Sequence, residues 1–196
     1  DGATHQCCED IALMREIPGM VVINPCDDVE ARAAVKAAYE YVGPVYLRFG
    51  RLAVPVLNDE STYKFEIGKG VKLKDGKDIS IIATGLCVSE AVKAVDMLAA
   101  DGIDAELINI HTIKPIDEDI IAETAQKTGR VFTVEEHSII GGLGSAVAEV
   151  LAEKCPTKLT RIGVRDTFGE SGPAKELLHK YELDAEGIYK QIKAAL

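Results

Sequence analysis

The first loop of the chain carries side chains that can hydrogen-bond hydroxyl and carbonyl groups. It reads DGATHQ, with an Asp-Gly turn at Asp1 and an imidazole at His5. We expect Thr4 to cap the helix that follows, so that His5 lies in its first turn, where the helix dipole disfavours an imidazolium. A neutral imidazole can donate or accept a hydrogen bond near pH 7, and a nearby carboxylate can bind a second hydroxyl. The alternative is structural: Asp1 supports a turn and His5 lies at the surface.

A second loop, VYLRFGR, carries two arginines at the end of a predicted strand. Arg48 falls near the carboxyl end of that strand, and Arg51 follows it. Ligands of open α/β sheets bind at the carboxyl ends of the strands. The planar guanidinium of Arg48 suits a phosphate or a carboxylate, which it can bind through two parallel hydrogen bonds. The alternative is a surface ion pair.

The stretch EEHSIIGGLGSAVAE joins a predicted strand to a helix through a glycine cluster, as a dinucleotide-binding turn does. The match is poor, because Val147 stands where the third small residue belongs and HSII intervenes where the turn should be tight. We expect the glycines to allow a close approach to a neighbouring backbone instead. These glycines are Gly141, Gly142 and Gly144. The polar residues before them, expected at the strand end or at an interface, are Glu135, Glu136 and His137.

Alternating strand and helix patterns position these loops. The run ISIIATG is almost continuously apolar, as expected of a parallel strand that is covered on both faces. Ser89 and Gly102 are predicted to cap the helix that follows it. Strands are predicted at 20–24, 44–50, 79–85, 104–111, 130–136 and 159–164, and helices at 7–16, 27–42, 89–102, 117–129, 144–155, 172–181 and 184–196. The predicted fold class is α/β: a partial parallel-sheet layer followed by a complete three-layer α/β/α domain with a mostly parallel sheet.

Three segments differ in completeness. Residues 1–57 offer too few strands and helices to bury both faces of a sheet, so we interpret them as the back half of a larger domain that begins upstream or on another chain. Gly, Asn and Asp punctuate 58–77 without a sustained period, which is typical of a linker. Residues 78–196 hold enough strands and helices for a self-sufficient domain.

Composition limits the class of partner. The 196 residues carry a net charge of -10 and the pI is near 4.9, which argues against nucleic-acid and anionic-membrane partners, because both require concentrated Lys and Arg. No apolar run approaches the ~20 residues of a membrane span, and nothing resembles a secretory signal. Five scattered cysteines favour unpaired thiols in a reducing cytoplasm, where we expect the protein. His111 and His179 are expected to be structural or surface residues.

Four stretches resemble the thiamine-diphosphate-dependent transketolase family. The opening DGATHQCCEDIALMREIPGMVV is similar to the D-G-x-T-H-Q loop and the following helix of its pyrimidine-binding domain. PVYLRFGR, VFTVEEHSIIGGLGSAVAEVL and RIGVRDTFGESGPAKELLHKYELDAEGI resemble later segments. The likeness covers nearly the whole chain and points to the C-terminal half of transketolase, particularly the form divided into two subunits. Deoxyxylulose-phosphate synthase and the β subunits of 2-oxoacid dehydrogenases are close relatives, but RDTFGESG suits transketolase better.

The resemblance implies a role for the first two loops. The family places the D-G-x-T-H-Q loop at the mouth of the cofactor funnel, which implies that Asp1 and His5 contact sugar hydroxyls and that Arg48 grips a substrate phosphate. The implied boundaries are 1–57 for the remnant of the pyrimidine-binding domain, 58–77 for the linker and 78–196 for the transketolase-like C-terminal domain.

The resemblance also implies cofactors held mostly by other polypeptide. Family members activate thiamine diphosphate with a Glu beside aromatic residues, upstream of the D-G-x-T-H-Q loop, and hold the diphosphate and Mg²⁺ with a G-D-G…N motif of another domain. Neither occurs in these residues. We therefore expect no cofactor-binding, metal-binding or complete catalytic set here, and Glu135 and Glu136 are placed away from the cofactor. The chain alone should be inactive and should need an N-terminal transketolase portion or subunit, in a homodimer or a heterotetramer.

The implied reaction is the reversible transfer of a two-carbon ketol unit between sugar phosphates, with the cofactor as electron sink. An assembly or dimerisation module is the alternative from another class, because family active sites form between subunits and this domain has no complete site. The corresponding part of a deoxyxylulose-phosphate synthase or of a 2-oxoacid dehydrogenase β subunit is a further alternative.

Overall fold

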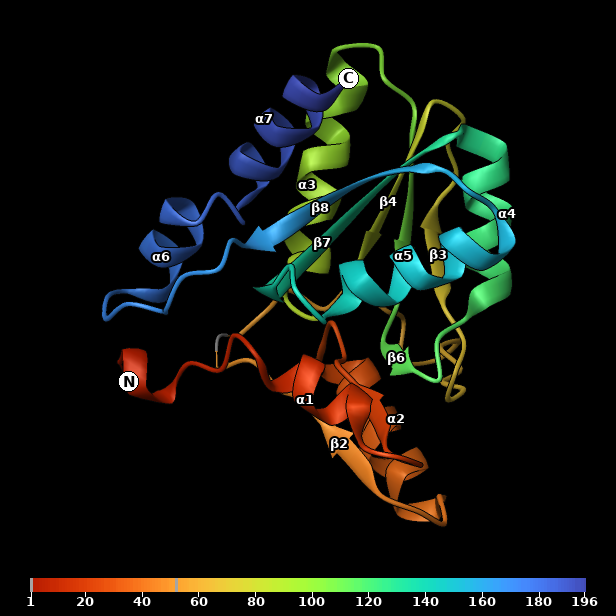
Figure 1. Cartoon of the computed structure of the whole chain (residues 1–196), viewed down its shortest axis with the longest axis vertical. Helices are drawn as coiled ribbons and strands as arrows, with labels where there is room; N and C mark the ends of the chain where they lie inside the picture. Colours follow the sequence, from red (N-terminus) through yellow and green to blue (C-terminus); the bar gives the residue numbers. More distant parts are fainter. Residues whose placement is uncertain (1, 52) are drawn as a thin grey trace.

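The computed structural model describes residues 2–51 and 53–196 and contains two sheets (Figure 1). The smaller sheet has the strand order β2-β1-β6, and the larger has the order β3-β5-β4-β7-β8. The predicted fold class is confirmed, because a partial layer precedes a three-layer α/β/α domain whose strands are parallel apart from one edge strand. In the described ranges no helix is long and apolar enough to cross a membrane.

The N-terminal part supplies most of the small sheet. β1 (Val21–Ile23) runs parallel to β2 (Val45–Leu47), and α2 (Asp28–Glu40) connects them. The 3₁₀ turn η1 (Ala3–His5) and α1 (Asp10–Glu16) precede β1. The predicted cap at Thr4 is wrong, because the backbone becomes extended at Gln6 and α1 begins only at Asp10. His5 therefore ends a separate turn instead of beginning the helix.

The N-terminal layer is built into the C-terminal domain. After β5 the chain leaves the large sheet and adds β6 (Thr112–Lys114) antiparallel to β1. The loop after β1 in turn lies on the ends of the large-sheet strands: the N–H of Gly85 donates to the carbonyl of Asn24 at 3.2 Å, and the N–H of Asn24 donates to the carbonyl of His111 at 2.8 Å. Gly85 has φ +58°, and a Cβ there would lie 2.5 Å from the Asn24 amide. The crevice at the carboxyl ends of β4 and β5 is thus filled by the protein's own chain.

The large sheet is covered by helices on both faces (Figure 1). On β4, Ile79 and Ile81 join the core beneath α3 and α7, whereas Ile82 joins the core beneath α4 and α5. This alternation explains the continuous apolar run in the sequence. The strands are β3 (Val71–Lys74), β4 (Ile79–Ala83), β5 (Ala105–Asn109), β7 (Arg130–Ser138) and β8 (Lys158–Val164). The helices are α3 (Cys87–Ala100), α4 (Glu118–Thr128), α5 (Leu143–Lys154), α6 (Ala174–Lys180) and α7 (Ala185–Ala195).

Two local predictions need correction. The segment 58–77, predicted as a linker, contains β3, which pairs antiparallel with β5. β3 escapes prediction because it is a short edge strand whose side chains are only half buried or exposed. The helix expected to be capped by Ser89 begins instead at Cys87, and the Ser89 hydroxyl donates to the carbonyl of Leu86 at 3.0 Å.

Candidate functional site

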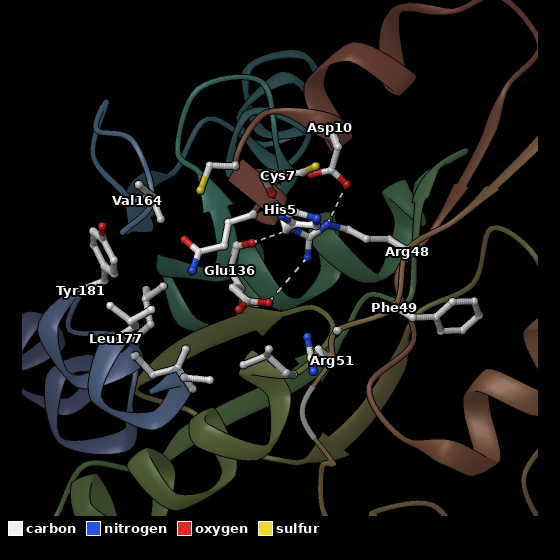
Figure 2. A pocket seen from close by; sticks show the side chains of 18 of the residues that line it. His5, Cys7, Asp10, Arg48, Phe49, Arg51, Glu136, Val164, Leu177 and Tyr181 are labelled. Carbon is white, nitrogen blue, oxygen red and sulfur yellow. Dashed lines mark hydrogen bonds and ion pairs between the residues drawn. The ribbon is translucent and has the colours of Figure 1, made fainter. Parts of the chain in front are cut away.

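A cleft of about 830 Å³ lies between the N-terminal loops and the C-terminal end of the chain (Figure 2). One wall comes from the loop before α1 and the end of β2, and the other comes from the end of β8, α6 and the residues after α6. His5 and Arg48 both line it, together with Asp10 and Glu136. The two predicted site residues that the structure describes therefore share one cleft. Asp1, the third predicted residue, lies outside the described residues.

The DGATHQ loop is held by the segment between β8 and α6. The Ala3 N–H donates to Ser171 Oγ at 3.3 Å, and Gln6 Nε2 donates to the carbonyl of Glu170 at 2.8 Å. A Cβ at Gly169 would lie 2.0 Å from Gln6 Oε1, so a larger residue there would displace the Gln6 side chain from its present position. Two of the stretches that carry the family resemblance thus contact each other.

His5 is exposed at the mouth of this loop. Its Nδ1 lies 3.0 Å from Thr4 Oγ1, which leaves Nε2 without a hydrogen-bond partner among residues 2–51 and 53–196. The Nε2 atom at the edge of the imidazole is therefore available to hydrogen-bond a hydroxyl or a carbonyl in the cleft.

Arg48 is held mostly inside the protein, with 12% of its side chain exposed. Nε donates to Asp10 Oδ2 at 2.8 Å, and Nη2 donates to the carbonyls of Cys7 at 3.0 Å and Glu136 at 2.9 Å. Burial is the largest single influence and disfavours the cation, but Asp10, Glu136 and Tyr46 together outweigh it and raise the pKa of Arg48. Nη1 forms no hydrogen bond within the described chain and lies 3.8 Å from Glu136 Oε2. Arg48 therefore offers the cleft one nitrogen, and the predicted two-bond fork is already used internally.

Asp10 positions Arg48, and the sequence pattern does not predict this role. Its Oδ2 also accepts the hydroxyl of Tyr46 at 2.8 Å. Burial and the Asp10 carboxylate raise the pKa of Tyr46 to about 12. An acidic residue in the first turn of a helix is sufficiently explained by the helix dipole, so only the folded contact reveals its second function.

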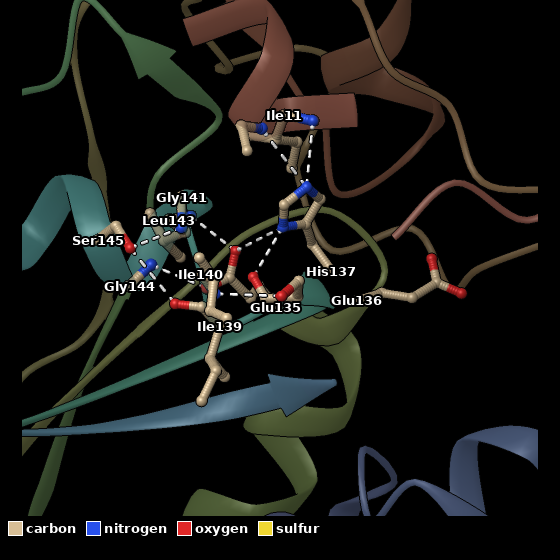
Figure 3. A network of polar contacts seen from close by, with 12 residues as sticks. Ile11, Glu135, Glu136, His137, Ile139, Ile140, Gly141, Leu143, Gly144 and Ser145 are labelled. Carbon is tan, nitrogen blue, oxygen red and sulfur yellow. Dashed lines mark hydrogen bonds and ion pairs between the residues drawn. The ribbon is translucent and has the colours of Figure 1, made fainter. Parts of the chain in front are cut away.

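The end of β7 divides its polar residues between two environments (Figure 3). Glu135 is buried and accepts the N–H groups of Leu143 at 2.6 Å and Gly144 at 2.8 Å, so it caps α5. Burial raises the pKa of Glu135 to about 7. Glu136 instead lines the cleft. Because the side chains of a strand alternate, His137 lies on the same side as Glu135. The same alternation along the predicted strand could have shown from the sequence that Glu135 and His137 face one side of the sheet and Glu136 the other.

The glycine cluster makes close approaches, as predicted, but to side chains. A Cβ at Gly142 would lie 2.0 Å from Glu135 Oε2, and one at Gly144 would lie 2.8 Å from Thr133 Oγ1. Because Glu135 already occupies two N–H groups at the start of α5, these groups are not open to the phosphate of a dinucleotide.

Two further predictions concern histidines and metals. His111 is buried against the ring of Phe65, with centroids 4.3 Å apart, and His179 is exposed, with Nδ1 2.7 Å from Asp184 Oδ2. Both match their predicted structural or surface roles. Within the described part of the chain, no group of three or more His, Cys, Asp or Glu side chains lies together in a way that could hold a metal ion.

Comparison with known proteins relates both parts of the chain to one family. Residues 1–56 match the transketolase pyrimidine binding domain, and residues 68–188 match the transketolase C-terminal domain. Over 194 residues the chain is 52% identical to a Methanocaldococcus jannaschii protein that carries the provisional name of a transketolase C-terminal section, covering 98% of this chain and 60% of that protein.

Two further relatives extend the comparison. A 1-deoxy-D-xylulose-5-phosphate synthase of Heliobacterium modesticaldum is 39% identical over 190 residues, which are 96% of this chain and 29% of that protein. A solved structure described as a split gene transketolase, inactive beta4 tetramer, matches with a TM-score of 0.95 at 48% identity, over 100% of this chain and 64% of that one. The chain thus spans less than two thirds of the length of the relatives it matches.

Proposed function

The chain belongs to the transketolase family, and we propose that it forms the C-terminal part of a cytoplasmic transketolase that transfers a two-carbon ketol unit between sugar phosphates. The proposal assigns 1–57 to the end of the pyrimidine-binding domain and 78–196, together with β3, to the C-terminal domain. It leaves the rest of 58–77 as the connection between them.

The observation that carries the proposal is the cleft shared by His5 and Arg48. In the proposed complex, Nη1 of Arg48 donates a charge-assisted hydrogen bond to the sugar's phosphate, and Nε2 of His5 hydrogen-bonds a hydroxyl. Asp1 is proposed to bind a second hydroxyl. These contacts orient the sugar and lower the entropic cost of bringing its reacting carbon into place.

Thiamine diphosphate and Mg²⁺ are the proposed cofactors of the complete enzyme. The described residues include no cluster that could hold a metal ion, so they do not fit the Mg²⁺ diphosphate group. We assign its binding to an N-terminal transketolase portion or subunit, in a homodimer or a heterotetramer, and derive no step through it. This chain's own residues bind and orient the sugar phosphate, and the chain alone is expected to be inactive.

An assembly module is the second candidate. The name of the solved relative describes an inactive beta4 tetramer, and the N-terminal layer of this chain exposes large apolar side chains, with Tyr39 91% and Val42 98% exposed. Exposed apolar residues at one end of a domain are typical of surfaces that bind other polypeptide.

A ketol-transfer assay tests the proposal. The chain is incubated with a ketose phosphate, an aldose phosphate, thiamine diphosphate and Mg²⁺, alone and with N-terminal transketolase polypeptide that supplies the cofactor regions. We expect transfer only in the combined sample, and a loss of transfer when Arg48→Gln replaces the wild type. Transfer by the chain alone overturns the proposal. Complex formation without transfer supports the assembly module. In a parallel sample with pyruvate in place of the ketose phosphate and D-glyceraldehyde 3-phosphate as the aldose phosphate, release of 1-deoxy-D-xylulose 5-phosphate and CO2 assigns the chain to that synthase.

A further inference from the structure

Three consecutive residues at the end of β7 contact the N-terminal wall of the cleft, and Figure 3 shows the contact that His137 makes with α1. The carbonyl of Glu136 accepts Nη2 of Arg48 at 2.9 Å, and the N–H of Ser138 donates to the carbonyl of Cys8 at 2.8 Å. Between them, His137 contacts the first turn of α1. One strand of the larger sheet therefore contributes to holding the wall that carries His5 and Arg48, in addition to the contacts from the segment between β8 and α6.

The contacts of His137 require a neutral ring. Nδ1 lies 2.7 Å from the carbonyl of Ser138, so it carries the proton and donates. Nε2 faces the N–H groups of Ile11 at 3.2 Å and Ala12 at 3.5 Å, so it accepts. Because Glu9, the residue at the cap position of α1, forms no side-chain cap in the described structure, the imidazole supplies the acceptor that the first turn of a helix needs.

Asp10 offers His137 a second, unused partner. Its Oδ2 holds Arg48 and Tyr46, each at 2.8 Å. Its Oδ1 is buried without a hydrogen bond in the described residues and lies 3.9 Å from Nε2 of His137. A buried carboxylate oxygen without a partner is costly, and a protonated imidazole at this distance could satisfy it by a small rotation.

We propose that His137 is a positioning residue of the cleft, whose neutral ring holds the first turn of α1 and whose protonated ring turns to Asp10 and weakens the Asp10–Arg48 pair. A proton on Nε2 would face the N–H groups of Ile11 and Ala12, so the ring must leave them for Oδ1 of Asp10. Asp10 then divides its charge between two cations. The effect on ligand binding rests on the proposed function, in which Arg48 binds the sugar's phosphate.

Charged groups reach His137 from each neighbouring element. Glu135, on the same strand, has Oε2 3.8 Å from Nδ1, while Asp10 approaches from α1 and Arg48 from the loop after β2. Burial is the largest influence and lowers the pKa of His137, and Arg48 lowers it further, whereas Asp10 and two backbone groups raise it. Because the folded-state pKa is lowered, the neutral-ring contacts are fully present above about pH 6.5 and are lost as the pH falls through the folded-state pKa.

Two substitutions separate positioning from simple packing. In His137→Gln the amide oxygen can take the place of Nε2 and accept the N–H groups of Ile11 and Ala12 at any pH. In His137→Asn the shorter side chain reaches only as far as the position of Nδ1 and does not reach the N–H groups of Ile11 and Ala12. Gln should therefore rescue the contact and remove its pH dependence, whereas Asn should lose the contact.

Amide hydrogen exchange of Ile11 and Ala12, followed by NMR as protection relative to an unstructured peptide, is the first readout. In the wild type, protection should fall about tenfold, the factor for one net hydrogen bond, as the pH is lowered from about 7.5 until the ring resonances of His137 show that it is protonated. His137→Gln should keep its protection over this range, and His137→Asn should lack it at both ends. Equal protection in the two variants, or unchanged wild-type protection once the His137 ring is protonated, overturns the proposal.

Calorimetric titration with D-ribose 5-phosphate is the second readout. The ratio of variant to wild-type affinity cancels the ionisation of the phosphate and every other pH effect that the three proteins share. This ratio should rise severalfold for His137→Gln as the pH falls, and it should be well below one for His137→Asn at the higher pH. If no protein binds the sugar phosphate but the exchange result holds, the proposed function fails and the positioning of α1 stands. If the sugar phosphate binds and both variants match the wild type, the positioning role alone is refuted.

Discussion

Replacing Gly142 by alanine should destabilise the chain through a steric conflict that cannot relax easily. A Cβ at this position would lie 2.0 Å from Oε2 of Glu135 and 2.6 Å from Nδ1 of His137. Oε2 is fixed by the N–H of Leu143 at 2.6 Å, and Nδ1 is fixed by the carbonyl of Ser138 at 2.7 Å. The φ of Gly142 is -82°, outside the left-handed region, so we attribute the cost to the contact.

The magnitude follows from two overlapping losses. Moving the Glu135 carboxylate breaks its hydrogen bond to Leu143, which costs about 1.5–3 kcal/mol for a charged group. Inserting a methyl group into a packed core costs about 1–3 kcal/mol. We therefore expect Gly142→Ala to lower the free energy of unfolding by about 3–5 kcal/mol, because both losses occur in the same variant.

Urea unfolding followed by circular dichroism measures this loss. Gly50→Ala is the matched control, because among the described residues a Cβ there would meet only Leu86 Cδ2, at an ordinary 3.4 Å, and its effect should stay within about 0.5 kcal/mol. If Gly142→Ala costs less than about 1 kcal/mol, or no more than Gly50→Ala, the steric role of the glycine cluster is refuted.

Three further substitutions test buried polar contacts by unfolding measurements. Asp10→Asn should cost about 3 kcal/mol because Arg48 loses its buried counter-charge; a change under about 0.5 kcal/mol contradicts this. Burial raises the pKa of Glu135 from 4.5 to about 7, so the stability it contributes is present below pH 4.5 and is lost as the pH rises through 7. The wild type should therefore lose about 3 kcal/mol of unfolding free energy from this group over that range, and Glu135→Gln should not. Parallel curves of unfolding free energy against pH for the two proteins would refute the pKa shift. Tyr63→Phe should lower the free energy of unfolding by about 1.5–3 kcal/mol, because the Tyr63 hydroxyl donates to the buried Glu30 at 2.5 Å. No loss would mean that this contact does not anchor the segment 58–77, as expected of a simple linker.

The larger sheet could be predicted from the sequence because its strands are buried on both faces. Ile79, Ile81 and Ile82 belong to one apolar run, and a short run of this kind ahead of a helix is typical of a parallel strand in an α/β sheet. β3 (VKLK) and β6 (TIK) could not be predicted, because lysines and a threonine stand among their few apolar residues, so neither forms an apolar run like the equally short β1 (VVI) and β2 (VYL), and their pairing partners are distant in the sequence. The same limit applies to 104–111, where the pattern predicts a strand but not the return of the chain to the small sheet.

The site could be predicted in position but not in detail. The rule that ligands bind at strand ends brings His5 and Arg48 to one cleft, as the structure shows. The partner of Arg48 remains hidden in the sequence, because Asp10 meets it only through tertiary packing. For the same reason the sequence could not show that two of the three guanidinium nitrogens are already used.

Titration of the chain with D-ribose 5-phosphate, followed by NMR of the His5 ring and the Arg48 guanidinium, decides whether the shared cleft binds a sugar phosphate. We predict that both sets of resonances shift along one saturation curve, that inorganic phosphate shifts Arg48 alone, and that Arg48→Gln abolishes the His5 shift at the same ligand concentration. Shifts confined to residues outside the cleft, or no saturable shift at either side chain, would contradict the proposed function.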